Sequence, residues 1–160
     1  MLHEQQAMSH HRAGPPGSAD VIRFVIHGQA ASKANSRKLV VIHGRPASIK
    51  SDAARNFERL ATLQIPAQAK RMLTCRVAVV LRMFYRTELP DLDESIVLDV
   101  MQAKYKTLED GQRVLIRSGV YVNDRQVRER HTYHGVDPQC PRVEVEVWPM
   151  QLDLPTGDAA

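Results

Sequence analysis

Three aspartates carry the clearest chemistry in this sequence. Asp91 and Asp93 are separated by one residue, and Asp124 follows further along the chain. Carboxylate oxygens are the ligands that hard cations such as Mg²⁺ prefer, and Mg²⁺ needs few of them because substrate phosphate and water complete its coordination. The chain is basic, with a formal net charge of +4 at pH 7, and its Lys and Arg would attract a polyanion. The combination predicts metal-dependent chemistry on a phosphodiester.

The charge is unevenly distributed along the chain. Residues 20–90 contain 13 Lys and Arg against 4 Asp and Glu, whereas residues 91–160 contain 8 against 13. This division suggests that the first part binds phosphate and the second holds a metal ion. A solvated surface with chance asymmetry is the alternative.

Length and composition predict one soluble domain. A chain of 160 residues has the size of a single domain, and it has no apolar run of the roughly 18 residues that a membrane span needs. The first residues lack the basic and apolar regions of a secretory signal. Cys75 and Cys140 lie far apart, which indicates reduced thiols. We therefore expect a cytoplasmic protein with no membrane partner.

The chain divides into a folded region and two tails. Residues 1–20 are polar and rich in Pro and Gly, which predicts a disordered extension. Residues 21–149 form the expected folded domain, and 150–160 a second loose tail.

The folded region predicts an α+β domain, in which a mixed sheet carries two main helices. Apolar or alternating segments predict strands at 21–27, 38–43, 75–85, 127–134 and 142–148. Helices are expected at 51–64, with Ser51 as N-cap and Pro66 as the stop, and at 93–105. Residues 106–119 are expected to form a loop or a small hairpin that turns at Asp110-Gly111.

The first two aspartates can face one site. Pro90 disfavours helix at Leu89, and in an extended segment residues two apart point the same way. Asp91 and Asp93 would then meet where the central strand leads into the second helix. A purely structural role is the alternative, with Asp93 as a helix cap and Asp91 as a turn residue.

The order of these parts resembles the RusA-type Holliday junction resolvases of bacteria and their phages. The resemblance spans about residues 22–148 and is carried by Asp91-Leu92-Asp93, the helix after it and the segment 119–127 (Gly-Val-Tyr-Val-Asn-Asp-Arg-Gln-Val). It implies that Asp91, Asp93 and Asp124 bind the metal and that Asp99 is the family's helix acid. Residues 28–37 look like the family's N-terminal basic loop.

The sequence departs from the family pattern in four places. Glu94 stands where Asn is usual, Asn123 replaces the first acid of an Asp-Asp pair, and 106–119 is longer than usual. The largest departure is Val97, at the position of the family's catalytic lysine. Lys33 is a candidate replacement, whereas Lys104 lies about 10 Å further along the predicted helix.

The resemblance implies an endonuclease that resolves four-way DNA junctions in recombination and repair, with Mg²⁺ (or Mn²⁺) as cofactor. Cutting a two-fold junction at two strands implies a homodimer. Glu94 could add a metal ligand. The predicted DNA-binding residues are Lys33, Arg37, Lys38, Arg45 and Lys50.

Two other functions stay open. Val97 favours a branched-DNA-binding protein that cuts slowly or not at all. A small nucleic-acid-binding regulator with purely structural acids is the weaker alternative. A zinc site at His131, His134 and Cys140 is not expected, because residues three apart on a strand face opposite sides.

Overall fold

The computed structural model describes residues 20–150, and its fold is α+β, as predicted. The expected tails therefore lie almost entirely outside the described residues. The strands are β1 (Ile22–His27), β2 (Arg37–Ile42), β3 (Arg45–Lys50), β4 (Val77–Tyr85), β5 (Lys104–Thr107), β6 (Arg113–Arg117), β7 (Val127–Val136) and β8 (Arg142–Pro149). The helices are α1 (Asp52–Gln64) and α2 (Ser95–Met101), with short 3₁₀ turns at Lys33–Asn35, Ala67–Ala69 and Asp124–Gln126.

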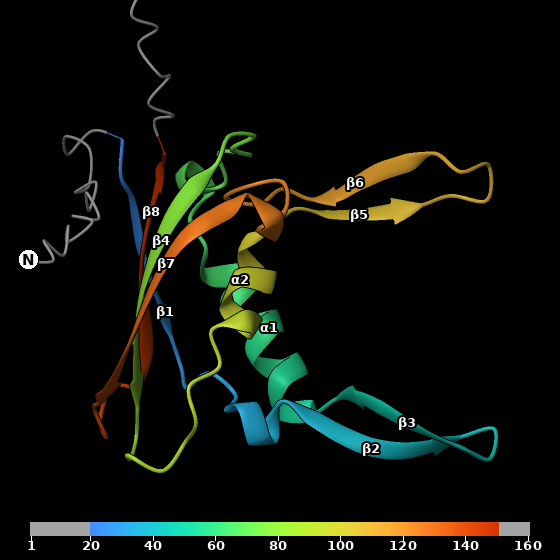
Figure 1. Ribbon diagram of the computed structural model, residues 1–160, viewed down its shortest axis with the longest axis horizontal. Helices are drawn as coiled ribbons and strands as arrows, with labels where there is room; N and C mark the ends of the chain where they lie inside the picture. The colour runs from blue at the N-terminus through green and yellow to red at the C-terminus, as the bar shows by residue number, and fades with distance from the viewer. Residues whose placement is uncertain (1–19, 151–160) are drawn as a thin grey trace, which may run out of the picture.

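A four-stranded mixed sheet in the order β1-β8-β4-β7 forms the body of the protein. β8 pairs antiparallel with both β1 and β4, whereas β4 and β7 are parallel. Both helices lie on one face of this sheet (Figure 1). Alternate side chains of β4 face the helices and are buried, namely Val77, Val79, Leu81, Met83 and Tyr85. None of the helices in the described part of the chain is long and apolar enough to cross a membrane.

Helix α1 begins and ends as the sequence predicts. The Ser51 hydroxyl oxygen accepts a hydrogen bond from the Ala54 N–H at 3.1 Å, which satisfies one of the free donors of the first turn. The helix ends before Pro66, and Ala54, Phe57 and Ala61 form its buried face. This face packs into the same core as the inner side of the sheet.

Helix α2 is shorter than predicted, and the expected extension to Tyr105 is wrong. The chain becomes extended at Gln102, where the segment that follows β6 takes over its hydrogen bonds. The Val120 N–H donates to the Met101 carbonyl at 2.7 Å, and the Ala103 N–H donates to the Tyr121 carbonyl at 3.0 Å. Tyr105 therefore lies on β5 and not on the buried helix face.

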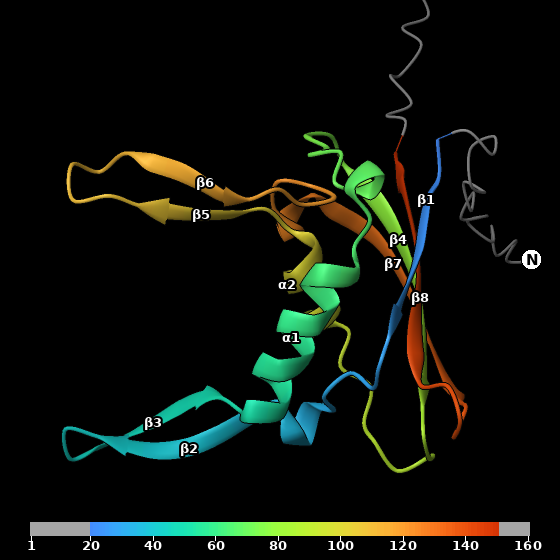
Figure 2. The same ribbon diagram turned by 180° about the vertical axis from the view of Figure 1, so that it is seen from behind.

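Two hairpins project from the body on the same side, and the helices lie between their bases (Figures 1 and 2). The β5–β6 hairpin fits the expected small hairpin. β3, in contrast, was not predicted. It pairs with β2 through a two-residue turn at His43 and Gly44, whose φ angles are 50° and 75°. Positive φ at both central residues gives a two-residue turn the twist that matches its two flanking strands.

Candidate active site

The first candidate carboxylate, Asp93, lies two residues before the start of α2. Its Oδ1 accepts hydrogen bonds from the Ser95 N–H at 3.2 Å and from the Ser95 hydroxyl. Asp93 therefore accepts hydrogen bonds from the first residue of α2, but the N-cap position of this helix is Glu94 and not, as the structural alternative had expected, Asp93. The hydrogen bonds that it receives within the described chain fall on Oδ1, so Oδ2 can still bind a ligand.

A buried tyrosine, Tyr85, lies close enough to Asp93 and Glu94 for their charges to affect it. The Tyr85 side chain is 1% exposed, and its hydroxyl has no hydrogen-bond partner within the described residues. Burial raises the pKa of Tyr85, the Asp93 backbone N–H opposes this shift, and the charges of Asp93 and Glu94 add to it. A buried hydroxyl generally needs a partner. Within the described residues, Tyr85 is therefore a buried polar group left without a partner beside the charges of Asp93 and Glu94.

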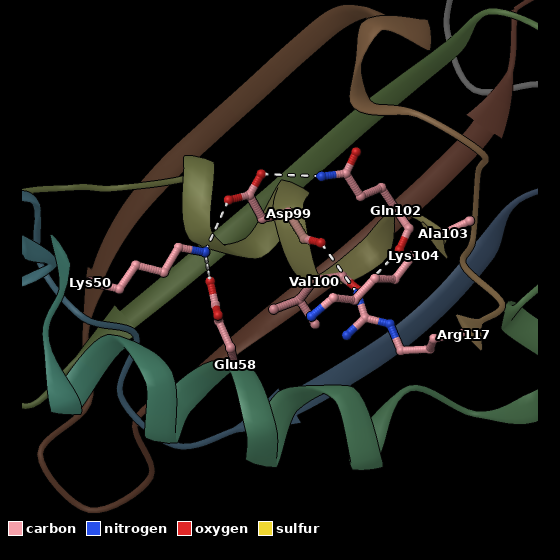
Figure 3. Close-up of a pocket in the computed structure, with 8 residues that line it drawn as sticks. All are labelled: Lys50, Glu58, Asp99, Val100, Gln102, Ala103, Lys104 and Arg117. Atoms are coloured by element: carbon pink, nitrogen blue, oxygen red, sulfur yellow. Dashed lines mark hydrogen bonds and ion pairs between the residues drawn. The ribbon is translucent and has the colours of Figure 1, made fainter. Parts of the chain in front are cut away.

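A second acidic group lies on the side of α2 that faces α1. Lys50, the last residue of β3, pairs with Glu58 of α1 and lies 3.5 Å from Asp99 Oδ2 (Figure 3). The three side chains are between 25% and 41% exposed, so their charges are only partly screened by water. The three charges thus join β3, α1 and α2 into one polar cluster.

Asp93 and Asp99 share a small pocket with two predicted DNA-binding residues. The pocket has a volume of about 70 Å³ and is lined by Arg37 and Lys50 as well as by the two aspartates. A neighbouring pocket of about 170 Å³ also includes Lys50 and Asp99, and it reaches Lys104 and Arg117 of the β5–β6 hairpin. Carboxylates and cations therefore border the same space.

Asp124 is linked to this region through Gln102. The Asp124 N–H donates to Gln102 Oε1 at 3.4 Å, and Gln102 Nε2 donates to Asp99 Oδ1 at 3.4 Å. The turn that carries Asp124 is fixed by Asn123, which accepts from the Arg125 N–H at 2.9 Å. Asp124 thus lies at the end of α2, whereas Asp93 lies at its beginning.

Tyr121 supports the same region from the core. Its hydroxyl donates to the Leu98 carbonyl at 3.0 Å. Burial raises the pKa of Tyr121, and the negative charges of Asp124 and Asp99 raise it further. The hydroxyl therefore stays protonated at neutral pH and donates its hydrogen bond permanently.

The structure does not gather the three predicted aspartates into one group. Asp91 lines a different pocket, with residues 29–32 and Asn35. Glu94 points toward β7, where its carboxylate lies 3.8 Å from Arg130. Between residues 20 and 150, no three His, Cys, Asp or Glu side chains are close enough to hold one metal ion. A Mg²⁺ site of one or two protein carboxylates is still compatible with this arrangement.

The predicted basic residues have different surroundings. Lys38 pairs with Asp52 at 2.7 Å, and Arg37 lies 3.5 Å from the Ser48 carbonyl. Lys33 is exposed in the first 3₁₀ turn, and Arg45 is exposed beside the hairpin turn. Of these predicted residues, Lys50 alone belongs to the polar cluster with Glu58 and Asp99.

Val97 faces the core and is 0% exposed. A lysine there would point into apolar surroundings, so the absence of the family's lysine matches the orientation of this helix. Lys50 brings a cation to α2 from another strand.

Sequence reasoning missed Glu58, Gln102 and Tyr85. Glu58 follows Ala54 by one helical turn, so helical spacing places it near the packed side of α1. Gln102 and Tyr85 were assigned to ordinary helix and strand positions, and nothing local marks them.

No protein-family model matches this chain, and no curated protein matches it significantly. The arrangement of these residues therefore has to support any functional assignment.

Proposed function

We propose that this protein is a divalent-metal-dependent endonuclease that acts on four-way DNA junctions. One observation carries the proposal: Asp93 and Asp99 line the same pocket as Arg37 and Lys50. A carboxylate pair beside two cations suits a phosphodiester, because the carboxylates can hold a metal ion while the cations hold the phosphate. The resemblance in the acidic motifs supports the same reaction.

The cations have distinct roles in this proposal. Arg37 lies at the base of the β2–β3 hairpin and binds the DNA backbone next to the scissile phosphate. Lys50 lies deeper, between Glu58 and Asp99, and neutralises charge that develops on the phosphate. A fixed charge in a partly desolvated site stabilises the transition state without having to reorganise. This preorganisation is the basis of electrostatic catalysis.

Mg²⁺ would be held by Asp93, with Asp99 as the carboxylate that shares its pocket. Asp91 and Asp124, on either side, would complete the site if DNA binding draws them inward. When bound, the ion activates water for attack and stabilises negative charge on phosphate. The hydrogen bonds from Ser95 to Asp93 Oδ1 fix the orientation of this carboxylate.

A second candidate function is a branched-DNA-binding protein without catalysis. Two observations favour it. Val97 is buried in the core, and the carboxylates of the described chain form no ready group of three. In this case the cations bind the junction and the acids mainly cap and orient α2.

The experiment that tests the proposal is cleavage of a labelled synthetic four-way junction with Mg²⁺ and with EDTA, beside a linear duplex of the same arm sequence. Paired nicks on the junction alone, and only with Mg²⁺, would support the nuclease. Tight junction binding without nicks would favour the binding protein. Equal affinity for both DNAs would contradict both candidates. Sedimentation in the same buffer tests the homodimer that paired cutting requires.

A further inference from the structure

We propose that the β5–β6 hairpin is a second DNA-binding element, which holds the nucleic acid backbone on the opposite side of the active site from the β2–β3 hairpin. This inference rests on the proposed function. It extends the DNA contact surface to residues 104–117, a segment to which the sequence motifs assign no role.

The hairpin carries the charge that this role requires. Residues 104–117 include four basic residues, Lys104, Lys106, Arg113 and Arg117, whereas the only acids are Glu109 and Asp110 at its turn. Lys104, Lys106 and Arg113 are exposed. The second part of the chain, although acidic as a whole, therefore contains a local basic surface.

Arg117 fixes the hairpin to the two helices. Its guanidinium donates to the Thr62 hydroxyl of α1 at 2.9 Å and to the Val100 and Gln102 carbonyls at the end of α2, both at 3.2 Å. The end of a helix presents unpaired carbonyls and partial negative charge, which favours a cation there. The hairpin is thus held in a defined direction at its base.

Cations from both hairpins meet at the active site. One pocket is lined by Lys50 of β3, by Lys104 and Arg117 of the β5–β6 hairpin and by Asp99 (Figure 3). Both hairpins extend from the same side of the molecule (Figure 2). A DNA backbone that contacts both hairpins would therefore run alongside the carboxylates, which lie between the points where the two hairpins leave the body.

The shape and the charge favour DNA over a second copy of this chain. A two-stranded ribbon fits the major groove of B-DNA. The β2–β3 hairpin, residues 37–50, carries four Lys and Arg and no Asp or Glu. A two-fold contact through these hairpins would place like charges opposite each other, which is unfavourable. A polyanion removes this repulsion.

The test measures binding of the full-length protein to a labelled synthetic four-way junction in EDTA, over a range of salt concentrations. The variants are Lys106→Gln, the double variant Lys104→Gln/Lys106→Gln, and Lys38→Gln in the other hairpin. The matched control is Arg23→Gln, which removes one exposed cation from the face of the sheet that the helices do not cover. Each lost phosphate contact should reduce the slope of log K against log salt by about 0.9.

We expect the slope to fall by about 0.9 for Lys106→Gln and about twice as much for the double variant, with no change for Arg23→Gln. The inference is overturned, and the proposed function stands, if the β5–β6 variants have the same salt slope as Arg23→Gln while the wild type binds and cuts the junction. If the wild type shows no junction binding, the proposed function fails first. Weaker self-association with unchanged DNA binding would assign the hairpin to a protein contact and overturn the inference.

Discussion

The Lys50 ammonium lies 3.5 Å from Asp99 Oδ2, although the two residues are 49 positions apart in the chain. Partial burial alone would lower the pKa of Lys50, but hydrogen bonds and charges from Glu58 and Asp99 outweigh this effect and raise it. Lys50 therefore stays protonated at neutral pH, beside the carboxylates. In the proposed function, this residue would supply the positive charge that the buried Val97 cannot.

Replacing Lys50 should separate catalysis from binding. In Lys50→Ala, we expect junction cleavage by the bound enzyme to slow by about 10²-fold, as for the loss of one electrostatic contact to a transition state. Junction affinity should change far less. Single-turnover cleavage and binding in EDTA measure the two effects, and circular dichroism verifies the fold.

Two further variants control this prediction. Lys50→Arg should recover part of the rate, because it keeps the charge. Lys38→Ala lies in the same hairpin but outside the polar cluster of Lys50, Glu58 and Asp99. It should weaken junction binding without slowing cleavage by the bound enzyme. Equal cleavage rates for Lys50→Ala and the wild type would exclude a role for Lys50 in the reaction.

The Asp93→Asn variant tests the metal assignment. An amide oxygen can still accept from Ser95, so α2 should begin normally. The lost carboxylate should abolish cutting, and junction binding should persist or strengthen because a negative charge near phosphate is gone. The measurement is cleavage and affinity across Mg²⁺ concentrations. The same measurements on Asp99→Asn and Asp124→Asn show which other carboxylates the reaction needs. Cutting by Asp93→Asn at the wild-type rate would refute the metal site.

Local rules were enough to predict helix α1 and strand β4, but not β3, which carries Lys50. Ser51 has the side chain that a helix N-cap needs, and the β-branched and apolar run that ends at Tyr85 favoured a central strand. The location of Asp93 was predicted from the order of the central strand and the second helix. These predictions depend on neighbouring residues, and the structure agrees with them.

Tertiary contacts decided what the sequence could not predict. The residues after Met101 have helical spacing, but the segment after Gly119 competes for their hydrogen bonds and ends the helix early. β3 contains Pro46 and Ala47, which are poor strand formers, and pairing with β2 compensates. The Lys50–Glu58–Asp99 cluster joins three elements, so no spacing along the chain indicates it.

Acid should remove a contribution of Asp137 to stability. Its carboxylate accepts from the Cys140 N–H at 3.0 Å and from Arg142 at 2.7 Å, and these contacts, the backbone one first, lower its pKa from the usual 3.8. A lowered pKa in the folded state stabilises the fold above the unfolded-state pKa, and this contribution is lost as the pH falls through the folded-state value. Asp137→Asn should therefore lower the Tm at neutral pH.

The difference in Tm between wild type and Asp137→Asn should shrink between about pH 5 and about pH 2. Thermal unfolding across this range measures it. Glu88→Gln, which removes an exposed acid from the connection after β4, serves as control. A Tm difference that stays constant with pH would show that the carboxylate charge is not what matters.

Gly119 should tolerate no side chain. A Cβ at this position would lie 2.4 Å from the Ala103 nitrogen and 2.6 Å from the Met101 carbonyl oxygen, both backbone atoms that cannot move aside. Gly119→Ala should lower the free energy of unfolding by about 1–3 kcal/mol or more. Denaturant unfolding measures this loss. Gly111→Asn is the control, because the space around Gly111 is open and Asn accepts its positive φ.

The exposed apolar side chains of the β2–β3 hairpin should contribute to DNA binding without contributing to its salt dependence. Leu39 and Val41 are 82% and 74% exposed, which offers apolar contact to base edges in a groove. Leu39→Ser/Val41→Ser should weaken junction binding while the slope of log K against log salt stays unchanged, because apolar contacts release no counterions. Leu63→Ser on α1, where the leucine is 74% exposed, is the matched control and should leave affinity unchanged. A changed slope, or an equal loss in the control, would mean that these side chains act through the fold and not through contact with DNA.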